Sequence, residues 1–314
     1  MKLSRLLSAA ALGVATVLAT PVIALAKVNV VATLPDLASL AREVGGDDVA
    51  VTALAVPTQD PHFVDARPSL VLPLNRADLL MLVGMQLEIG WLPNLITGSR
   101  NAKIQPNSAG TTTASGYFDA SSFVPLKQVP TTTVDRSMGD IHPQGNPHYM
   151  ADPRNAARVA LALADRLGEI DSAHAAGYRT RAKAFAAACA AFAAKEIARF
   201  GALPAERRKA VVYHQSMIYL LDWLGVQQSN TLEPKPGIPP SPDHVAKVLV
   251  QMRTQKIPAL LQEDYRPRNP GDLVADKAGA KHVIVPGGPN FDGGETYLAN
   301  VRTVVDRLYA GLKP

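Results

Sequence analysis

The 314-residue chain has one cysteine, Cys189, and this scarcity excludes two classes of protein. One thiol cannot close an intramolecular disulfide or build a Cys-rich zinc module. The chain also lacks a cluster of lysines and arginines. Its formal net charge is +5, but the basic residues are dispersed, so we expect no nucleic-acid partner. A hydrophobic fraction of 47% argues against a disordered chain, and the length suits two domains.

The first 26 residues have the features of a cleaved signal peptide. Lys2 and Arg5 precede an apolar run over residues 6–25, and Ala24-Leu25-Ala26 supplies the small residues that signal peptidase needs. A signal anchor is the alternative, because the run approaches the roughly 20 residues that span a bilayer. The A-x-A ending and the lack of a later long apolar stretch favour cleavage, and no cysteine near the cut offers a lipid anchor. We therefore expect an exported, periplasmic protein, with 30 basic and 27 acidic residues after cleavage.

Short apolar runs alternate with helix-length segments in both halves of the mature chain. This alternation is typical of βαβ units and a parallel sheet. The predicted strands are short and rich in aliphatic residues, and they lie at residues 28–33, 49–56, 77–83, 209–213, 259–262 and 282–285. The predicted helices of the second half lie at residues 217–224, 242–254, 270–278 and 297–312. Residues 101–147 are rich in Thr, Ser, Gly and Pro and predict a loop with room for one short strand.

An Ala-rich stretch at residues 171–200 lies between the halves. Because alanine is the best helix former, the stretch can form one helix of about 28 residues and about 42 Å, long enough to span two lobes. Two core helices with a bend at Gly177 are the alternative.

Three of the seven histidines lie in distinctive places. His62 is in a loop after the second predicted strand, His148 is in a loop before a helix, and His214 directly follows the strand at residues 209–213. Ligands of open α/β sheets bind beyond the carboxyl ends of strands. A proline precedes both His62 and His148 and stiffens the backbone there.

Imidazoles suit zinc, copper, nickel and iron, and three of them with one carboxylate would form a tetrahedral site. Since these histidines are far apart in sequence, the alternative is three loop histidines that satisfy local backbone groups. His142 is compatible with an outer ligand, a residue on the entry path of a metal, or an ordinary loop residue. We expect no ligand role for the remaining three, His174, His244 and His282.

Five blocks of sequence, in order, carry a resemblance to a known family. They are Asp60-Pro61-His62 with the PS, ADL, G and LE..WL elements that follow it, Asn146-Pro147-His148-Tyr149 with Asp152-Pro153, Tyr213-His214-Gln215 with Trp223-Leu224-Gly225, residues 232–237, and Tyr297 with Asn300-Val301. In order and spacing the chain resembles the metal-binding proteins of bacterial ABC importers for zinc and manganese, the ZnuA/TroA-like family of cluster A-I. The resemblance covers nearly all of the mature chain.

The resemblance implies an α/β protein in which two parallel-sheet lobes are joined by a long rigid helix, with the metal in the interlobe cleft. The implied boundaries are residues 27–170 for the N-terminal lobe, 171–200 for the interlobe helix and 201–314 for the C-terminal lobe. The resemblance also places metal ligands at His62, His148 and His214. Histidine rather than glutamate at the third position favours zinc over manganese, as does the preference of imidazole for zinc.

The fourth ligand departs from the family pattern. Relatives commonly carry an aspartate just after the last strand, where this chain has Pro286. We expect Glu263 to replace it, because strand ends of the second lobe face the cleft. The other candidates are Asp264, Asp292, Glu295 and water. The chain also lacks the long His/Asp/Glu-rich loop of many zinc members, so a metal-scavenging loop is not expected.

The resemblance predicts a non-enzymatic protein that captures zinc and delivers it to an ABC importer permease in the inner membrane. We expect a monomer. Two alternatives remain: a protein of the same fold that binds manganese, another divalent metal or an organic ligand, and an exported zinc-dependent hydrolase, since three histidines and an open position also describe catalytic zinc. The chain has no HExxH or GxSxG motif, which disfavours the hydrolase.

Overall fold

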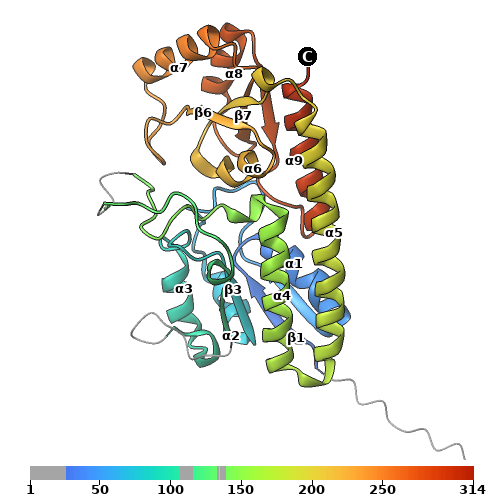
Figure 1. Cartoon of the computed structure of the whole chain (residues 1–314). Coiled ribbons are helices and arrows are strands. Elements are labelled where there is room, and N and C mark those ends of the chain that lie inside the picture. The colour runs from blue at the N-terminus through green and yellow to red at the C-terminus, as the bar shows by residue number, and fades with distance from the viewer. Residues whose placement is uncertain (1–25, 107–115, 133, 135–138) are drawn as a thin grey trace, which may run out of the picture.

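Two α/β lobes, one above the other, have a long helix along one side (Figure 1). This computed structural model describes residues 26–106, 116–132, 134 and 139–314. All but the last residue of the predicted signal peptide therefore lies outside the described residues. In the part of the chain that is described, no helix combines the length and the apolar character needed to cross a membrane.

The N-terminal lobe contains a four-stranded sheet with the order β2-β1-β3-β4, and every pairing is parallel. Alternate residues of a strand point to opposite faces, so each face of the sheet has its own helical layer. Helices α1, α4 and α5 cover one face, and α2 and α3 cover the other. The elements of this lobe are β1 (Val28–Ala32), α1 (Pro35–Gly45), β2 (Val49–Ala53), α2 (Val71–Arg76), β3 (Leu79–Leu82), α3 (Leu92–Ser99), β4 (Tyr117–Asp119) and α4 (Pro153–Ile170).

The C-terminal lobe repeats this topology. Its sheet has the order β6-β5-β7-β8 and is also entirely parallel. Helices α6 and α9 cover one face, and α7 and α8 cover the other. The elements are β5 (Lys209–Val212), α6 (Ile218–Trp223), β6 (Gln227–Thr231), α7 (Pro242–Thr254), β7 (Ala259–Glu263), α8 (Arg268–Ala278), β8 (Lys281–Val285) and α9 (Tyr297–Leu312).

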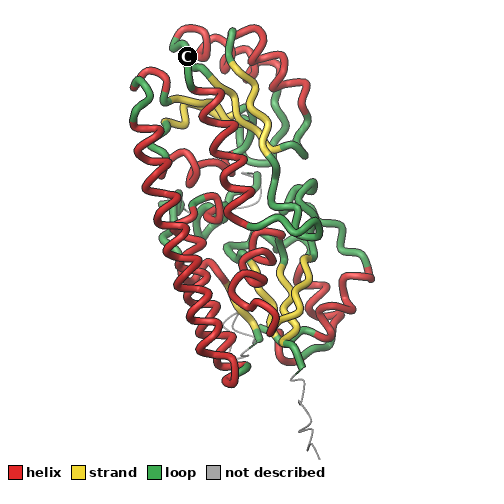
Figure 2. Tube along the Cα trace, turned by 90° about the vertical axis from the view of Figure 1, so that its right-hand side faces the viewer, coloured by secondary structure: helices red, strands yellow, loops and turns green. Residues whose placement is uncertain are grey.

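Helix α5 (Ala175–Gly201) joins the lobes as one continuous helix of 27 residues, about 40 Å long. It packs against α4 and α1 of the first lobe and α9 of the second, and it runs past both lobes in the second view (Figure 2). Buried residues of both lobes belong to one hydrophobic cluster that includes α5. The single long helix predicted from the alanine content is confirmed, and no break occurs at Gly177.

The lobes also contact each other directly beside the cleft. The Tyr297 hydroxyl donates to the Met150 carbonyl at 2.5 Å, and the Trp223 indole donates to the Ala151 carbonyl at 3.1 Å. Both aromatic side chains are buried. Because buried hydrogen bonds and apolar packing join the lobes, their relative orientation is stabilised on the side that carries α5.

The six predicted strands are all present, and the described part of residues 101–147 contains a short strand, β4, as its composition allowed. Strand β6 and helix α3 were not predicted. Strand β6 (QQSNT) has no apolar signal, since an edge strand with exposed or half-buried side chains tolerates polar residues, whereas α3 (LPNLITGS) is apolar but short.

Candidate metal centre

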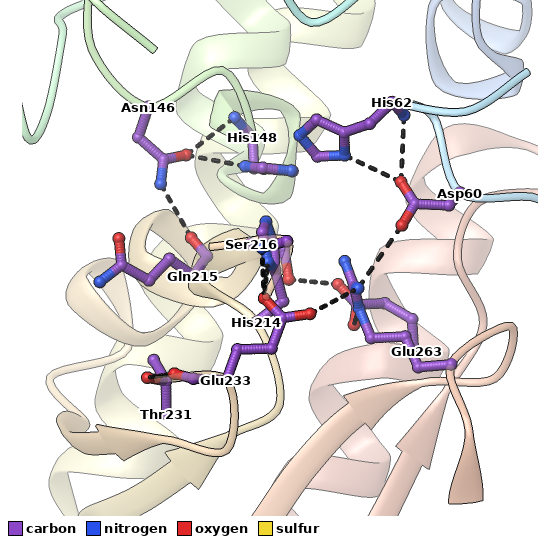
Figure 3. A network of polar contacts seen from close by, with 12 residues as sticks. Asp60, His62, Asn146, His148, His214, Gln215, Ser216, Thr231, Glu233 and Glu263 are labelled. Carbon is purple, nitrogen blue, oxygen red and sulfur yellow. Dashed lines mark hydrogen bonds and ion pairs between the residues drawn. The ribbon is translucent and has the colours of Figure 1, made fainter. Parts of the chain in front are cut away.

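Three histidines from loops at the carboxyl ends of strands converge between the lobes. His62 follows β2, His148 lies between β4 and α4, and His214 follows β5. Their ring centroids are 5.3 Å apart for His62 and His148, 5.4 Å for His62 and His214, and 5.4 Å for His148 and His214. One ligand atom from each ring lies within 4.8 Å of the other two. Figure 3 shows the rings of His62 and His148 pointing toward one another.

A shared local structure holds two of these rings. The Asp60 carboxylate accepts hydrogen bonds from the backbone amide of His62 at 3.0 Å and from its Nδ1 at 2.8 Å. The Asn146 side-chain oxygen accepts from the backbone amide of His148 at 3.0 Å and from its Nδ1 at 2.9 Å. The Asx-Pro-His sequence thus folds into the same turn twice, because an Asx side chain readily bonds the backbone two residues further on.

The third ring has a partner from another loop. Nδ1 of His214 lies 2.6 Å from Oε2 of Glu233, which also accepts from the Gly237 backbone amide at 2.8 Å. Gly237 has a φ of +74°, a conformation that glycine adopts without strain. The turn after β6 therefore fixes the carboxylate that orients His214.

These hydrogen bonds determine which ring nitrogen is available to a ligand. A carboxylate or amide oxygen facing Nδ1 requires the proton on Nδ1, which leaves the Nε2 lone pair for a metal. Nε2 of His148 is buried and has no hydrogen-bond partner among the described residues. Imidazoles sharing a tetrahedral zinc with Zn–N distances of about 2.0–2.1 Å would have ring centres about 5 Å apart. The observed spacing of the three rings is close to that value.

The electrostatics of the pocket favour neutral imidazoles. Burial lowers the pKa of His148 well below its ordinary value, and the neighbouring histidines and Arg266 lower it further. Burial also lowers the pKa of His214, although the hydrogen bond to Glu233 opposes the shift. Because only a neutral imidazole binds a metal, both rings are in the ligand form at neutral pH.

A buried network of charges surrounds the rings. The guanidinium of Arg266 lies 3.0 Å from Glu263, 3.4 Å from Glu233 and 3.5 Å from Asp60. Burial alone would raise the pKa of Asp60, but the hydrogen bonds from His62 and the charges of His62 and Arg266 outweigh it and lower the pKa to about 2. Three carboxylates and one guanidinium have a formal charge of −2, which a divalent cation would neutralise.

Glu263 has other partners in this structure, and its role as a ligand stays a prediction. Its carboxylate accepts from the Ser216 hydroxyl and from Nε of Arg266, and neither its oxygens nor a nitrogen of His142 belongs to the group of ligand atoms formed by the three histidines. Arg266 draws this carboxylate, at the end of β7, into an ion pair.

The other carboxylates considered for the fourth position lie elsewhere. Asp264 and Asp292 are exposed. Glu295 accepts from the backbone amide of Asn290 within its own glycine-rich loop, at 2.7 Å. Pro286, at the position of the usual aspartate, directly follows β8 and brings no donor atom.

His142, in contrast, lies at the cluster. Its Nε2 is 3.2 Å from Nε2 of His62, and the two ring centroids are 5.3 Å apart. Its Nδ1 donates to the Met85 carbonyl at 2.9 Å. His142, His148 and His214 line one small cavity, and His142 and His62 also line a larger groove beside it.

The remaining histidines have local partners away from the cluster. His174 contacts Asp171, His282 contacts Asp272, and His244 contacts the Thr231 carbonyl.

The structure also identifies residues that the sequence interpretation missed. Asn146, Glu233 and Arg266 orient the ligands or balance charge, but none was singled out as functional. The repeated Asx-Pro-His pattern was a usable signal for Asn146. Neither Glu233 nor Arg266 lies in such a repeated pattern. Glu233 follows β6 and Arg266 follows β7, so only the folded structure brings them to the histidines.

The two-lobed α/β fold with a continuous joining helix and histidines between the lobes defines a class: a substrate-binding protein with a metal site in its cleft. A family model described as the periplasmic component A of a zinc-uptake complex, ZnuA, matches residues 30–311. The chain belongs to this family, as the resemblance predicted.

Curated relatives in the family carry the names of several metals. The iron-binding protein YfeA of Yersinia pestis is 26% identical over 293 residues, which cover 91% of this chain and 86% of the relative. The manganese ABC transporter substrate-binding lipoprotein scaA of Streptococcus gordonii is 23% identical and covers 91% and 89%.

Solved structures share the fold. A crystal structure of ZnuA superposes with a TM-score of 0.74 at 20% identity and covers 91% of this chain and all of that one. The laminin-binding protein Lmb of Streptococcus agalactiae, described as an adhesin with metal-transporting activity, has a TM-score of 0.72 at 23% identity and covers 90% and 99%. At this identity the likeness shows the fold alone.

Proposed function

We propose that this chain is an exported substrate-binding protein that captures zinc in the interlobe cleft and delivers it to the permease of an ABC importer. Membership in the zinc-uptake family makes it a substrate-binding component of a metal importer rather than an enzyme. This membership disfavours the zinc-hydrolase alternative. A cleaved signal peptide at residues 1–26, a periplasmic location, an inner-membrane permease as partner and a monomeric state are parts of the proposal.

The observation that carries the proposal is the convergence of His62, His148 and His214. Each ring has an oxygen acceptor at Nδ1, so each presents Nε2 to one point between the lobes. Such outer partners orient ligating histidines and raise their basicity. The lobes at residues 27–170 and 201–314, joined through residues 171–200, would hold the ligands on opposite sides of the ion.

The choice of zinc depends on the donor atoms. Imidazole nitrogen suits zinc, whereas manganese prefers carboxylate, carbonyl and water oxygens, and divalent affinities rise from manganese to zinc for nitrogen sites. The group of three converging ligands contains no carboxylate among the described residues. Manganese or iron is the alternative, since relatives are named for those metals.

Competition titration tests this proposal. Apo protein is titrated with zinc and with manganese in the presence of a chromophoric chelator, and the His62→Ala, His148→Ala and His214→Ala variants are compared with His174→Ala as a control. We expect each of the three site variants to weaken zinc binding by at least about tenfold. Loss of a residue that only orients a ligand already costs about tenfold or more, and loss of the ligand itself should cost at least as much. Unchanged zinc binding in all three would contradict the site, and tighter binding of manganese than zinc would contradict the choice of metal.

A further inference from the structure

We propose that His142 is the fourth metal ligand, which makes the site four imidazoles in place of three imidazoles and a carboxylate. The inference rests on the proposed function, since it concerns the same metal. It supplies a fourth donor in a chain that has Pro286 where relatives commonly have an aspartate.

The contact between His142 and His62 carries the argument. Nδ1 of His62 faces the Asp60 carboxylate, and Nδ1 of His142 faces the Met85 carbonyl, so the proton of each neutral ring lies on Nδ1. Two Nε2 lone pairs then face each other across 3.2 Å. Such a pair repels unless a proton or a metal ion lies between the two nitrogens, and a metal ion also suits the other rings beside them. Two nitrogens bound to one tetrahedral zinc are about 3.3 Å apart, given Zn–N distances of about 2.0–2.1 Å.

The position of His142 relative to the other two rings agrees with this role. His142 lines the same small cavity as His148 and His214. Its ring centroid is as far from that of His62, at 5.3 Å, as the ring centroid of His148 is. His142 therefore borders the region between the three rings, but it is not part of the group of ligand atoms that lie within 4.8 Å of one another, so its side chain has to move toward the ion to bind it.

The backbone around His142 is held in place from both lobes. Met85 of the first lobe accepts its Nδ1 proton, and on the other side the Asp140 backbone amide donates to the Pro236 carbonyl of the second lobe at 2.8 Å. Gly139 has a φ of +91°, and a Cβ there would lie 2.2 Å from the Pro236 oxygen, so the close approach requires glycine. His142 also lines the larger groove, which places it between this groove and the cavity. A ligand at this position closes the outer side of the ion.

An all-imidazole site has a consequence for selectivity. Nitrogen donors favour zinc over manganese more strongly than a mixed set with a carboxylate does. His142 would therefore act as a specificity-determining ligand, and its removal should lower zinc affinity more than manganese affinity.

X-ray absorption at the zinc edge counts the imidazoles directly. For the zinc-loaded wild-type protein we expect four nitrogen donors, all with the outer-shell scattering of imidazole rings. His142→Ala should show three imidazoles and one light oxygen donor, and His142→Gln should give the same result while retaining a side chain that can donate to the Met85 carbonyl. His174→Ala serves as the histidine control and should retain four.

Affinity gives a second readout. Competition titration of His142→Ala should show zinc binding weakened by about tenfold or more, with a smaller loss for manganese, while circular dichroism matches the wild type. Three imidazoles in the wild-type spectrum, or a His142→Ala spectrum identical to it, would overturn the inference and leave the three-histidine site intact. If the proposed function itself fails, the wild-type protein shows no zinc binding or shows zinc binding independent of His62, His148 and His214.

Discussion

The outer carboxylate Glu233 provides a sharp test of how the pocket binds a cation. Glu233→Gln removes one negative charge but keeps an oxygen of similar position, which can still accept from Nδ1 of His214 and from the Gly237 amide. The variant therefore separates the charge of Glu233 from its shape. It also leaves all the imidazoles in place.

The magnitude follows from the distances. Oε2 lies 2.6 Å from Nδ1 of His214, so an ion bound to Nε2 of that ring is roughly 6 Å from the carboxylate, given a Zn–N distance of about 2 Å. At an effective dielectric constant of ~20, a unit charge and a divalent ion at that separation attract by about 5 kcal/mol. This value is an upper limit, because Arg266 at 3.4 Å already offsets part of the charge. We expect the measured loss to be about 1.4–2.8 kcal/mol, or 10- to 100-fold in zinc affinity, the usual range for outer partners of ligating histidines.

The assay is competition titration with a chromophoric chelator at pH 7.5, with circular dichroism to verify the fold. Glu206→Gln is the matched control, since Glu206 is exposed on the same lobe. A loss of less than about threefold in Glu233→Gln, with the control unchanged, would refute the electrostatic reasoning.

Three further predictions concern the pocket and the core. Burial lowers the pKa of His148 and His214, so acidification should weaken zinc binding only below the ordinary histidine range, by up to about tenfold per pH unit for each ligand that is protonated. A pH series of the same titration measures this effect, and an affinity that rises on acidification would contradict the sign. Burial raises the pKa of Cys189 to about 12, so a thiol reagent should label the native protein negligibly at pH 8 and the denatured protein fully; rapid native labelling would contradict the packing. Glu88 accepts from the Thr33 hydroxyl at 2.7 Å and from the Val83 and Gly84 amides at 2.7 and 3.1 Å. Glu88→Ala should therefore lower the free energy of unfolding, measured by chemical denaturation, by about 3 kcal/mol. A loss below about 1 kcal/mol would show that these donors find other partners.

The fold was predictable from the sequence because its elements have strong local signals. Buried strands such as β3 are continuous apolar runs, and the alanine content of residues 171–200 favours one helix. Edge strand β6 had no such signal, since its side chains are polar and half-exposed.

The site was predictable only in part. His62 and His148 have a proline and an Asx residue before them, which produce the same turn twice, and His214 directly follows a strand. The prediction of Glu263 as a ligand did not anticipate Arg266, three residues later, whose guanidinium forms an ion pair with it. Such a competition between a ligand role and an ion pair is decided by tertiary packing, and no local pattern records it.

The approach of His142 to His62 has the same origin. The two residues are 80 positions apart, and their contact depends on the Met85 carbonyl and on the close packing of Gly139 against Pro236. A composition-based interpretation therefore left His142 with three possible roles.

Metal analysis of the protein purified from its own export compartment without chelator tests the central claim most directly. The account predicts about one equivalent of zinc per chain, and a His214→Ala variant purified in the same way should contain far less. Protein that contains no metal, or that contains manganese or iron in place of zinc, would contradict the account.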